Sequence, residues 1–536
     1  MTRAGKQKEI IGINGTRPSI LSQNRPMKRC LQTLSSIWPY LALSAIVLIL
    51  FYATGYKQNW PHWVDQELTL SYNGLLVYSG SNQEYLDHPG FFSIHLIAYL
   101  IGIANYLGFY HLQNITDLNQ SSSMLESMRI LIITTRHAAL LTTIAYVLVA
   151  YYIAQKITRE RVLSFLIALL IFISNGVFFH FTLTRTEPIA FLFLLGSLYF
   201  YIQYFNSQGK QVLSLLACLL MLFCGALNKA QVLVLAPFYF TWTYYFISAK
   251  VEGKPIESNE SNDSDNPLKL ASLASFIALA LFYSLISSGL SLVINFGLIV
   301  FFYGLTFVSA KKVKINVFKA TSLFNIFYLI AFEALNYFSF KLNQNISIFT
   351  NIEDPISMTR WLAPDPNAEK IAMDSNALYV LSKIANSLLE PLITLFSKVS
   401  SPLILVIFCL VLLYGLRKKL NKVDITFGIY SFLAFYAVSL INRTRYIDAP
   451  HYLLLAEFFL LGFALVLIRK LDSIKAQVKA VSLLIFLILL VNLVPHTRYV
   501  NLLMRKGGQP FCSSPQIFLE KIDAKRIAAE CQGNPI

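Results

Sequence analysis

The stretch that decides the fold is VLSFLIALLIFISNGVFFHFTLTRTEPIAFLFLLGSLYFYIQYF, residues 162–205. It contains two apolar runs, 162–179 and 188–205, each close to the ~20 residues that a helix needs to cross a bilayer. Between the runs lies a short turn that carries Arg185 and Glu187. The stretch therefore predicts two transmembrane helices joined by a charged turn.

The rest of the chain repeats this pattern. Of its 536 residues, 56% are hydrophobic and only 13% are charged, which excludes a soluble globule. The formal net charge is +16, but most Lys and Arg residues lie in short loops between apolar runs. Such bases are typical of topology signals rather than of a nucleic-acid surface. We predict an all-α, multi-pass protein of the plasma (inner) membrane with no nucleic-acid partner.

Thirteen apolar runs are predicted to span the membrane. They cover residues 36–55, 129–154, 162–179, 188–205, 212–228, 231–248, 270–287, 290–309, 317–337, 391–415, 425–441, 451–468 and 480–495. The run 91–109 is left out, because counting it would turn the later basic loops outward. We expect it to form an interfacial or re-entrant helix of the first outer loop.

This threading predicts three regions. Residues 1–35 form a basic cytoplasmic tail, 36–495 a transmembrane domain and 496–536 a tail outside the cytoplasm. Within the domain, the outer segment 338–390 is long enough to act as a lid. Cys512 and Cys531 lie in the outer tail, where a disulfide and two unpaired cysteines are both open alternatives.

The first outer loop, residues 56–128, concentrates candidate catalytic residues. Asp65 and Glu67 follow the first span, and Asp87 and His88 precede the run 91–109. A partly desolvated carboxylate at the membrane surface is a better base than one in water. The alternative interpretation is a solvated loop with an interfacial aromatic belt.

Two further outer turns carry charge. Arg185 and Glu187 open the helix at Pro188, and charges at this depth are costly unless they pair or bind a ligand. Lys229 interrupts the apolar runs 212–228 and 231–248, where a cation suits a phosphate. A mutual Arg185–Glu187 salt bridge is the structural alternative.

The stretch INRTRYIDAPHY, residues 441–452, forms a second candidate anion site. Arg443, Arg445, Tyr446 and His451 gather there at the start of a span. The alternative is an anchor for lipid headgroups. Carboxylates in one outer loop and cations in three others favour handling of a phosphorylated lipid.

Other chemistries lack their patterns. The sequence has no zinc-type His and Cys spacing and no Ser-His-Asp order. No dedicated metal-ligand cage is visible, so no cofactor is assigned, although a divalent cation could assist between an acid and a phosphate. A transporter would more often carry charges in the middle of its helices and broken spans in paired halves.

Together these residues resemble the GT-C glycosyltransferases that use polyprenyl-phosphate sugars, particularly the bacterial branch related to protein O-mannosyltransferases and lipid A aminoarabinose transferases. Asp65 is followed fifteen residues later by Gly80, and then by Asp87-His88 before the run 91–109. This order is similar to that of the family's first outer loop and interfacial helix.

The resemblance extends to the later motifs. The family's Arg-acid pair is matched by Arg185 and Glu187, and its Lys-Gly/Ala turn by Lys229-Ala230. Its late Arg-Tyr-Leu-Leu-Pro motif is matched by His451-Tyr452, or in a second register by Arg445-Tyr446. His451 stands where the family has Arg, and Gln66 where it commonly has Glu, so the phosphate-binding Arg is not fixed by the motif.

The resemblance implies an inverting transfer of one sugar from a polyprenyl-phosphate donor to an envelope lipid, glycan or protein outside the cytoplasm. By this resemblance Asp65 would be the base and Asp87 a supporting acid, while Glu67 stays a further catalytic candidate from its position after the first span. The donor phosphate would lie near His88, Arg185, Lys229 and one of Arg443, Arg445 and His451. A lipid-linked saccharide transporter, a glycan polymerase or ligase, and a non-catalytic scaffold are the alternatives.

Overall fold

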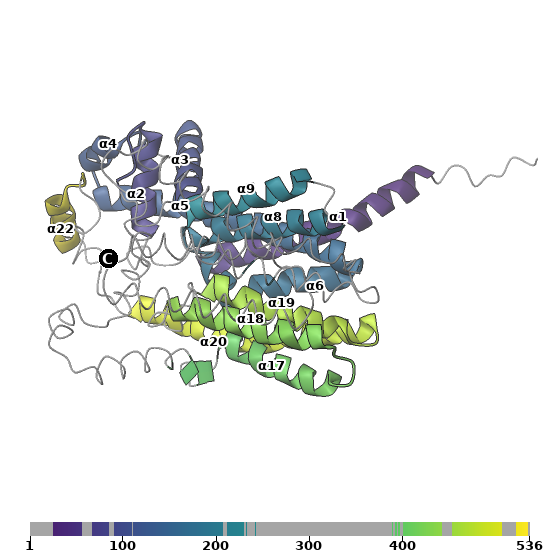
Figure 1. The fold of residues 1–536 in the computed structure, drawn as a ribbon. Helices are drawn as coiled ribbons and strands as arrows, with labels where there is room; N and C mark the ends of the chain where they lie inside the picture. Colours follow the sequence, from purple (N-terminus) through teal and green to yellow (C-terminus); the bar gives the residue numbers. More distant parts are fainter. Residues whose placement is uncertain are drawn as a thin grey trace, which may run out of the picture.

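The chain folds into long helices that lie side by side, with short helices crossing one end of the bundle (Figure 1). The computed structural model describes residues 25–55, 67–84, 90–109, 111–206, 212–229, 400–441, 453–505 and 521–533, with isolated residues at 232, 239 and 242 and between 389 and 396. Within these residues every regular element is a helix.

The long elements agree with most of the predicted spans. They are α1 (Arg25–Leu50) with the π-helical turn η2 (Phe51–Gly55), α5 (Met124–Thr158), α6 (Arg161–Ile173), α8 (Glu187–Asn206), α9 (Val212–Asn228), α17 (Ser401–Leu416), α18 (Lys422–Ile441), α19 (Leu453–Arg469) and α20 (Ile474–Arg505). The short elements are α2 (Glu67–Tyr78), α3 (Phe91–Tyr106), α4 (Ile115–Gln120), α7 (Asn175–His180) and α22 (Ala524–Gly533).

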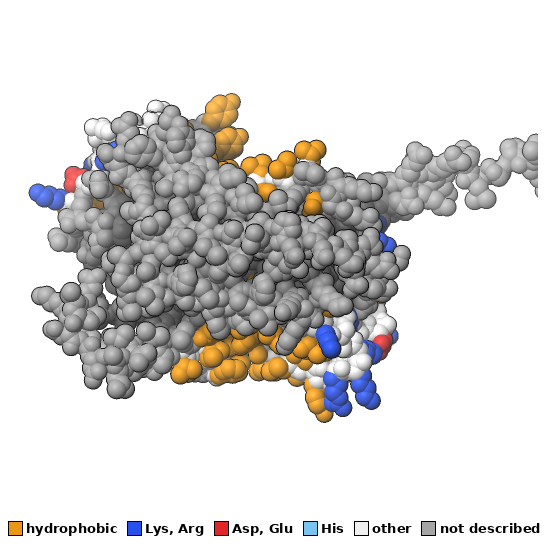
Figure 2. Space-filling model, in the orientation of Figure 1, with side chains coloured by type: hydrophobic (Ala, Val, Ile, Leu, Met, Phe, Trp, Pro, Cys, Tyr) orange, Lys and Arg blue, Asp and Glu red, His pale blue; other side chains and the backbone are white. Residues whose placement is uncertain are grey.

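Two of the described helices are long and apolar enough to cross a membrane, α5 and the 474–492 part of α20. The helices of the bundle also present large apolar side chains outward, such as Ile49, Val411 and Phe486. Figure 2 shows such apolar surface along the bundle. The predicted spans at 270–287, 290–309 and 317–337 and the predicted lid lie outside the described residues, so the count of thirteen stays a prediction.

The predicted span 162–179 is wrong in one respect, because its helix breaks at Ser174. There the backbone is extended, with ψ 146°, and α7 starts afresh. Polar side chains from other helices satisfy the interrupted backbone: Asn492 donates to the Ile173 carbonyl at 2.6 Å, and Glu457 accepts from the Gly176 amide at 3.0 Å. A local hydropathy pattern does not contain these distant partners.

The first helix also differs from its prediction, since α1 begins at Arg25 rather than at Ser36. Its first turns therefore belong to the segment that we expected to be a basic tail. The run 91–109 forms α3, which lies across the bundle next to α2, as expected of a helix that does not span (Figure 1).

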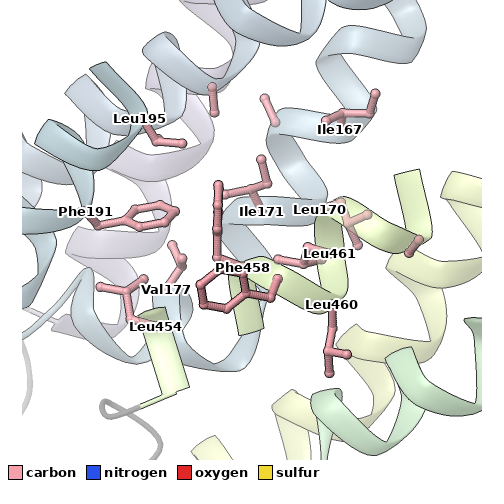
Figure 3. Packing of buried hydrophobic residues seen from close by; sticks show 14 of the residues in the cluster. Ile167, Leu170, Ile171, Val177, Phe191, Leu195, Leu454, Phe458, Leu460 and Leu461 are labelled. Carbon is pink, nitrogen blue, oxygen red and sulfur yellow. The ribbon is translucent and has the colours of Figure 1, made fainter. Parts of the chain in front are cut away.

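One apolar core holds the bundle together. Phe191 and Leu195 of α8 face Ile171 of α6 and Phe458 of α19 (Figure 3), and the rings of Phe191 and Phe458 lie 5.9 Å apart. Burial of such side chains contributes roughly 1.5–3 kcal/mol each. This packing fixes α6, α7 and α8 relative to α19.

A second core lies under the short helices. It joins α2, α3, α4 and the first turns of α5 to residues 522 and 527. Gly74 lets α2 approach α3 closely, because a Cβ at this position would collide with Ile97. The end of the bundle with this core is called the site end here. The end that carries the α5–α6, α17–α18 and α19–α20 turns is called the opposite end.

Residues 521–533 are part of the site end. The Glu530 carboxylate accepts the backbone amides of Met124 and Leu125, both at 3.1 Å, at the start of α5. Lys521 pairs with Glu84 at 2.6 Å. The first loop and this tail segment therefore share one side of the bundle, as the threading predicts. The predicted Cys512–Cys531 pairing involves side chains outside the described part of the structure.

Candidate active site

A buried cluster of charges lies at the site end, where α8 begins and α9 ends. Glu187 is the first residue of α8, and Arg185 holds its carboxylate with two hydrogen bonds, Nη2–Oε1 at 3.1 Å and Nε–Oε2 at 3.2 Å. Lys229 Nζ lies 2.9 Å from Glu187 Oε1. All three side chains are at most 3% exposed. The structure thus brings together Arg185, Glu187 and Lys229, three residues that the sequence singled out.

The triad brings two cations, Arg185 and Lys229, to one carboxylate. His180, at the end of α7, also interacts electrostatically with Glu187. A buried excess of positive charge is expensive unless an anion joins it. The arrangement is therefore suited to a ligand that brings negative charge, such as a phosphate.

Asn228 joins the triad to the start of α3. Its side chain accepts from the Ser93 amide at 2.9 Å and donates to the Ser93 hydroxyl at 3.1 Å and to the Thr186 carbonyl. Its own carbonyl accepts from the Gly90 amide at 3.0 Å. Gly90 has a left-handed backbone, with φ 57°, which favours glycine. The chain thus enters α3 directly beside Lys229.

A second ion pair lies next to the triad. Arg136 of α5 holds the Glu67 carboxylate at both oxygens, with Nε–Oε1 at 2.8 Å and Nη2–Oε2 at 3.0 Å. The two side chains are 2% and 0% exposed. Glu67, which the sequence offered as a catalytic acid, is thus fully engaged at the start of α2.

The turn 181–186 connects the two charge clusters. The Thr184 amide donates to Glu67 Oε1 at 3.4 Å, and the next residue in the chain is Arg185. On the same two helices as the Glu67–Arg136 pair, the hydroxyls of Ser71 and Thr135 lie 2.8 Å apart. The turn 181–186 therefore contacts the start of two helices. Glu67 at the start of α2 accepts from Thr184, and Asn228 bonds both to Thr186 and to Ser93 near the start of α3.

The remaining predicted site residues lie outside the described part of the chain. They are Asp65, Asp87, His88, Arg443, Arg445, Tyr446 and His451. In the sequence, Asp65 stands two residues before Glu67 and His88 two residues before Gly90. Both loops thus adjoin described residues that touch the turn 181–186.

The sequence interpretation missed Arg136 and Glu457. Arg136 lies inside the predicted span 129–154 and Glu457 inside 451–468. Glu457 is 1% exposed and accepts from the Gly176 amide and from the Ser401 hydroxyl, so it ties α19 to α7 and α17. The signal was available, because an ionisable residue within an apolar span is by default a functional or structural site.

Among the described residues, no three His, Cys, Asp or Glu side chains come together as ligands for a metal ion. The described cysteines Cys218, Cys224 and Cys409 carry free thiols.

Over the described residues, fold and site define a bundle of helices with apolar outer faces and a buried cluster of charges at one end. Residues 35–253 match the family model of the dolichyl-phosphate-mannose-protein mannosyltransferases, a match that covers less than half of the chain. It includes Glu67, Arg136, Arg185, Glu187 and Lys229. The predicted resemblance to GT-C glycosyltransferases is confirmed over this segment. No curated protein matches the chain.

Proposed function

We propose that the protein is an integral-membrane glycosyltransferase that moves one sugar from a polyprenyl-phosphate donor to an envelope lipid, glycan or protein. The observation that carries this proposal is the triad of Arg185, Glu187 and Lys229, which buries two cations beside one carboxylate at the site end. The family match over residues 35–253 supports the class of donor. Mannose is the first sugar to test, because the family's description names it.

In the proposed reaction an acceptor hydroxyl attacks the anomeric carbon from the face opposite the phosphate. The new C–O bond forms as the bond from carbon to the phosphate oxygen breaks, and its electron pair leaves with the polyprenyl phosphate. The hydroxyl proton passes to a carboxylate base. The sugar is thus transferred with inversion.

The triad acts on the leaving group in this scheme. The phosphate gains one negative charge as the bond breaks, and preorganised cations stabilise charge that develops in the transition state. Lys229 is the second cation beside the Arg185–Glu187 pair. His88 and one of Arg443, Arg445, Tyr446 and His451 complete the proposed phosphate site.

Asp65 is the proposed base, with Asp87 as the second acid. Glu67 is the weaker candidate, because both of its oxygens are held by Arg136 and its side chain is fully buried. Its bond to Thr184 instead suits a role in holding the start of α2 against the turn that carries Arg185.

Asp65→Asn tests the proposal. Membranes containing the protein would receive labelled polyprenyl-phosphate mannose, and transfer to any membrane product would be compared with donor binding. We expect transfer to fall at least about 10²-fold, in the range of a lost general base, while donor binding is retained. Asp472→Asn is the matched control, because Asp472 is an exposed acid at the opposite end.

Unchanged transfer in Asp65→Asn would contradict Asp65 as the base and direct attention to Asp87. If wild-type protein moved the labelled donor between leaflets without forming a glycosylated product, the protein would be a transporter. Product formation and movement of the donor between leaflets are measured in the same membranes, so a transferase and a transporter give different results.

We propose further that the site end faces outward, with the N-terminus in the cytoplasm. Asp472 and Asp523 are exposed at the two ends of the molecule and offer a direct test. With the native cysteines replaced, Asp523→Cys should react with a membrane-impermeant thiol reagent in intact cells, and Asp472→Cys should not. The opposite result would invert the threading.

A further inference from the structure

A cavity opens between α5, α6, α8 and α19, away from the charge triad. Its walls are apolar, with Ile153, Leu163, Leu198 and Leu465 among the lining residues. The charged lining residues are Arg469 and Lys470, at the C-terminal end of α19. The cavity is therefore apolar along its length and cationic at the opposite end of the bundle.

The cavity is elongated along the helices. Its lining runs along α19 from Phe458 to Lys470, the residue after the helix end, and these twelve steps span about 18 Å at 1.5 Å per residue. On α5 the lining reaches from Ala150 to Thr158 in the same direction. An apolar interior of this length and direction suits a hydrocarbon chain and not a sugar, since a sugar's hydroxyls would lack hydrogen-bond partners.

The rim of the cavity belongs to a strongly basic end. The helix ends there carry Lys156, Arg159, Arg161, Arg417, Lys418, Lys419, Lys422, Arg469, Lys470, Lys475 and Lys479, against Glu160, Asp424 and Asp472. Figure 2 shows Lys and Arg side chains gathered at one end of the molecule, beyond the apolar surface of the bundle. Anionic lipid headgroups are attracted to such clusters.

The two charged residues at the rim differ in their roles. Lys470 is largely buried and pairs with the Asp424 carboxylate at 3.2 Å, so it joins α19 to α18. Arg469 is exposed at the mouth of the cavity. Arg469 is thus the rim residue best placed to meet a headgroup in the surrounding leaflet.

We propose that this cavity binds one acyl chain of an anionic phospholipid from the leaflet at the opposite end, with the lipid phosphate at Arg469. The donor of the proposed reaction is a different lipid, because its phosphate would lie at Arg185 and Lys229, at the other end of the bundle. The phospholipid site does not depend on glycosyl transfer.

Lipid retention tests this site. The protein would be reconstituted into vesicles of phosphatidylglycerol and phosphatidylcholine in equal amounts and extracted in mild detergent, and native mass spectrometry would count the lipids bound per chain. We expect one retained lipid, with phosphatidylglycerol preferred. Arg469→Gln should lower that preference about fivefold, the effect of one basic residue near an anionic surface.

Two further variants separate the cavity from general surface charge. Ala154→Phe places a ring in the cavity and should abolish retention of both lipids, and Leu198→Trp serves the same purpose if Ala154→Phe does not elute as a folded monomer. Arg417→Gln removes the same charge from the same end without touching the cavity lining, and its retention should equal that of the wild type.

Equal retention in wild type and a folded cavity-filling variant would overturn the proposal. A second result would also overturn it. In that case the wild type would retain added polyprenyl phosphate but no phosphatidylglycerol, and the cavity-filling variant would retain neither. That result would assign the cavity to the carrier lipid.

Discussion

Two buried clusters of charges adjoin the turn 181–186, and they are built differently. In the pair of Glu67 and Arg136, one carboxylate meets one guanidinium at both oxygens, so the charges cancel. In the triad, Glu187 is held in the same way by Arg185 and is approached by Lys229 as well. We therefore expect the Glu67–Arg136 pair to hold α2 to α5, and the triad, with its second cation, to contact a ligand.

Breaking the neutral pair should have the largest effect on stability. Arg136→Met leaves the Glu67 carboxylate buried without its partner, which costs about 3–5 kcal/mol of unfolding free energy. Denaturant unfolding in detergent, followed by circular dichroism, measures this loss. The double variant Glu67→Leu with Arg136→Met should recover most of it, because buried pairs replaced by apolar residues are often close to neutral. If the double variant were as unstable as the single one, the pair would do more than hold the fold.

The triad should respond in activity rather than in stability. Lys229→Met removes the extra cation and leaves Arg185 and Glu187 as a neutral pair. Transfer should therefore fall by about 10²–10³, the range for one lost electrostatic contact to a transition state. The assay is transfer from labelled polyprenyl-phosphate sugar, with the unfolding midpoint measured alongside it. Lys419→Met is the control, because Lys419 forms an exposed ion pair at the opposite end. Near-normal transfer by Lys229→Met would make the triad structural like its neighbour.

Glu457 offers an intermediate case, a buried carboxylate that is bound by neutral donors. Glu457→Gln keeps the shape of the side chain but replaces one acceptor oxygen with an NH2 donor. Either the Ser401 hydroxyl or the Gly176 amide then faces a donor instead of an acceptor. We expect a loss of about 1–3 kcal/mol in unfolding free energy. Transfer should also fall, because Glu457 holds α7 and α7 carries His180 toward Glu187. A loss of stability without any loss of transfer would show that α7 does not position the site.

The smallest effect is expected where a charge caps a helix near the surface. Glu530→Gln keeps one acceptor for the Met124 and Leu125 amides but removes the negative charge from the start of α5. The expected cost is about 0.3–1 kcal/mol, and high salt should mask it. Thermal unfolding at low and high salt measures both the loss of stability and its dependence on salt. A loss as large as that of Arg136→Met would place the tail segment among the main supports of the fold.

Much of the helical framework could be predicted from hydropathy. The runs 188–205 and 212–228 correspond closely to α8 and α9, and the run 91–109, which the bases of the later loops kept out of the predicted spans, forms α3. The break at Ser174 could not be predicted, because Asn492 and Glu457, which stabilise it, are distant in the sequence.

The candidate site was predictable in its residue types but not in its pairings. Arg185, Glu187 and Lys229 stand out because each is a charge at the end of an apolar run. That Glu67 would pair with Arg136 follows only from the packing of α2 against α5. A carboxylate offered as a catalytic acid from its position alone is held by a partner 69 residues away.

The docking of residues 521–533 has a consequence for biogenesis. Ile522 and Ile527 complete an apolar core whose other members lie between Leu68 and Ala138, so this core remains unfinished while the intervening chain is synthesised. Lys521 meets Tyr72 and Glu84 across more than 400 residues of sequence. A nascent chain interrupted before position 521 would display the core's open side to proteases and chaperones.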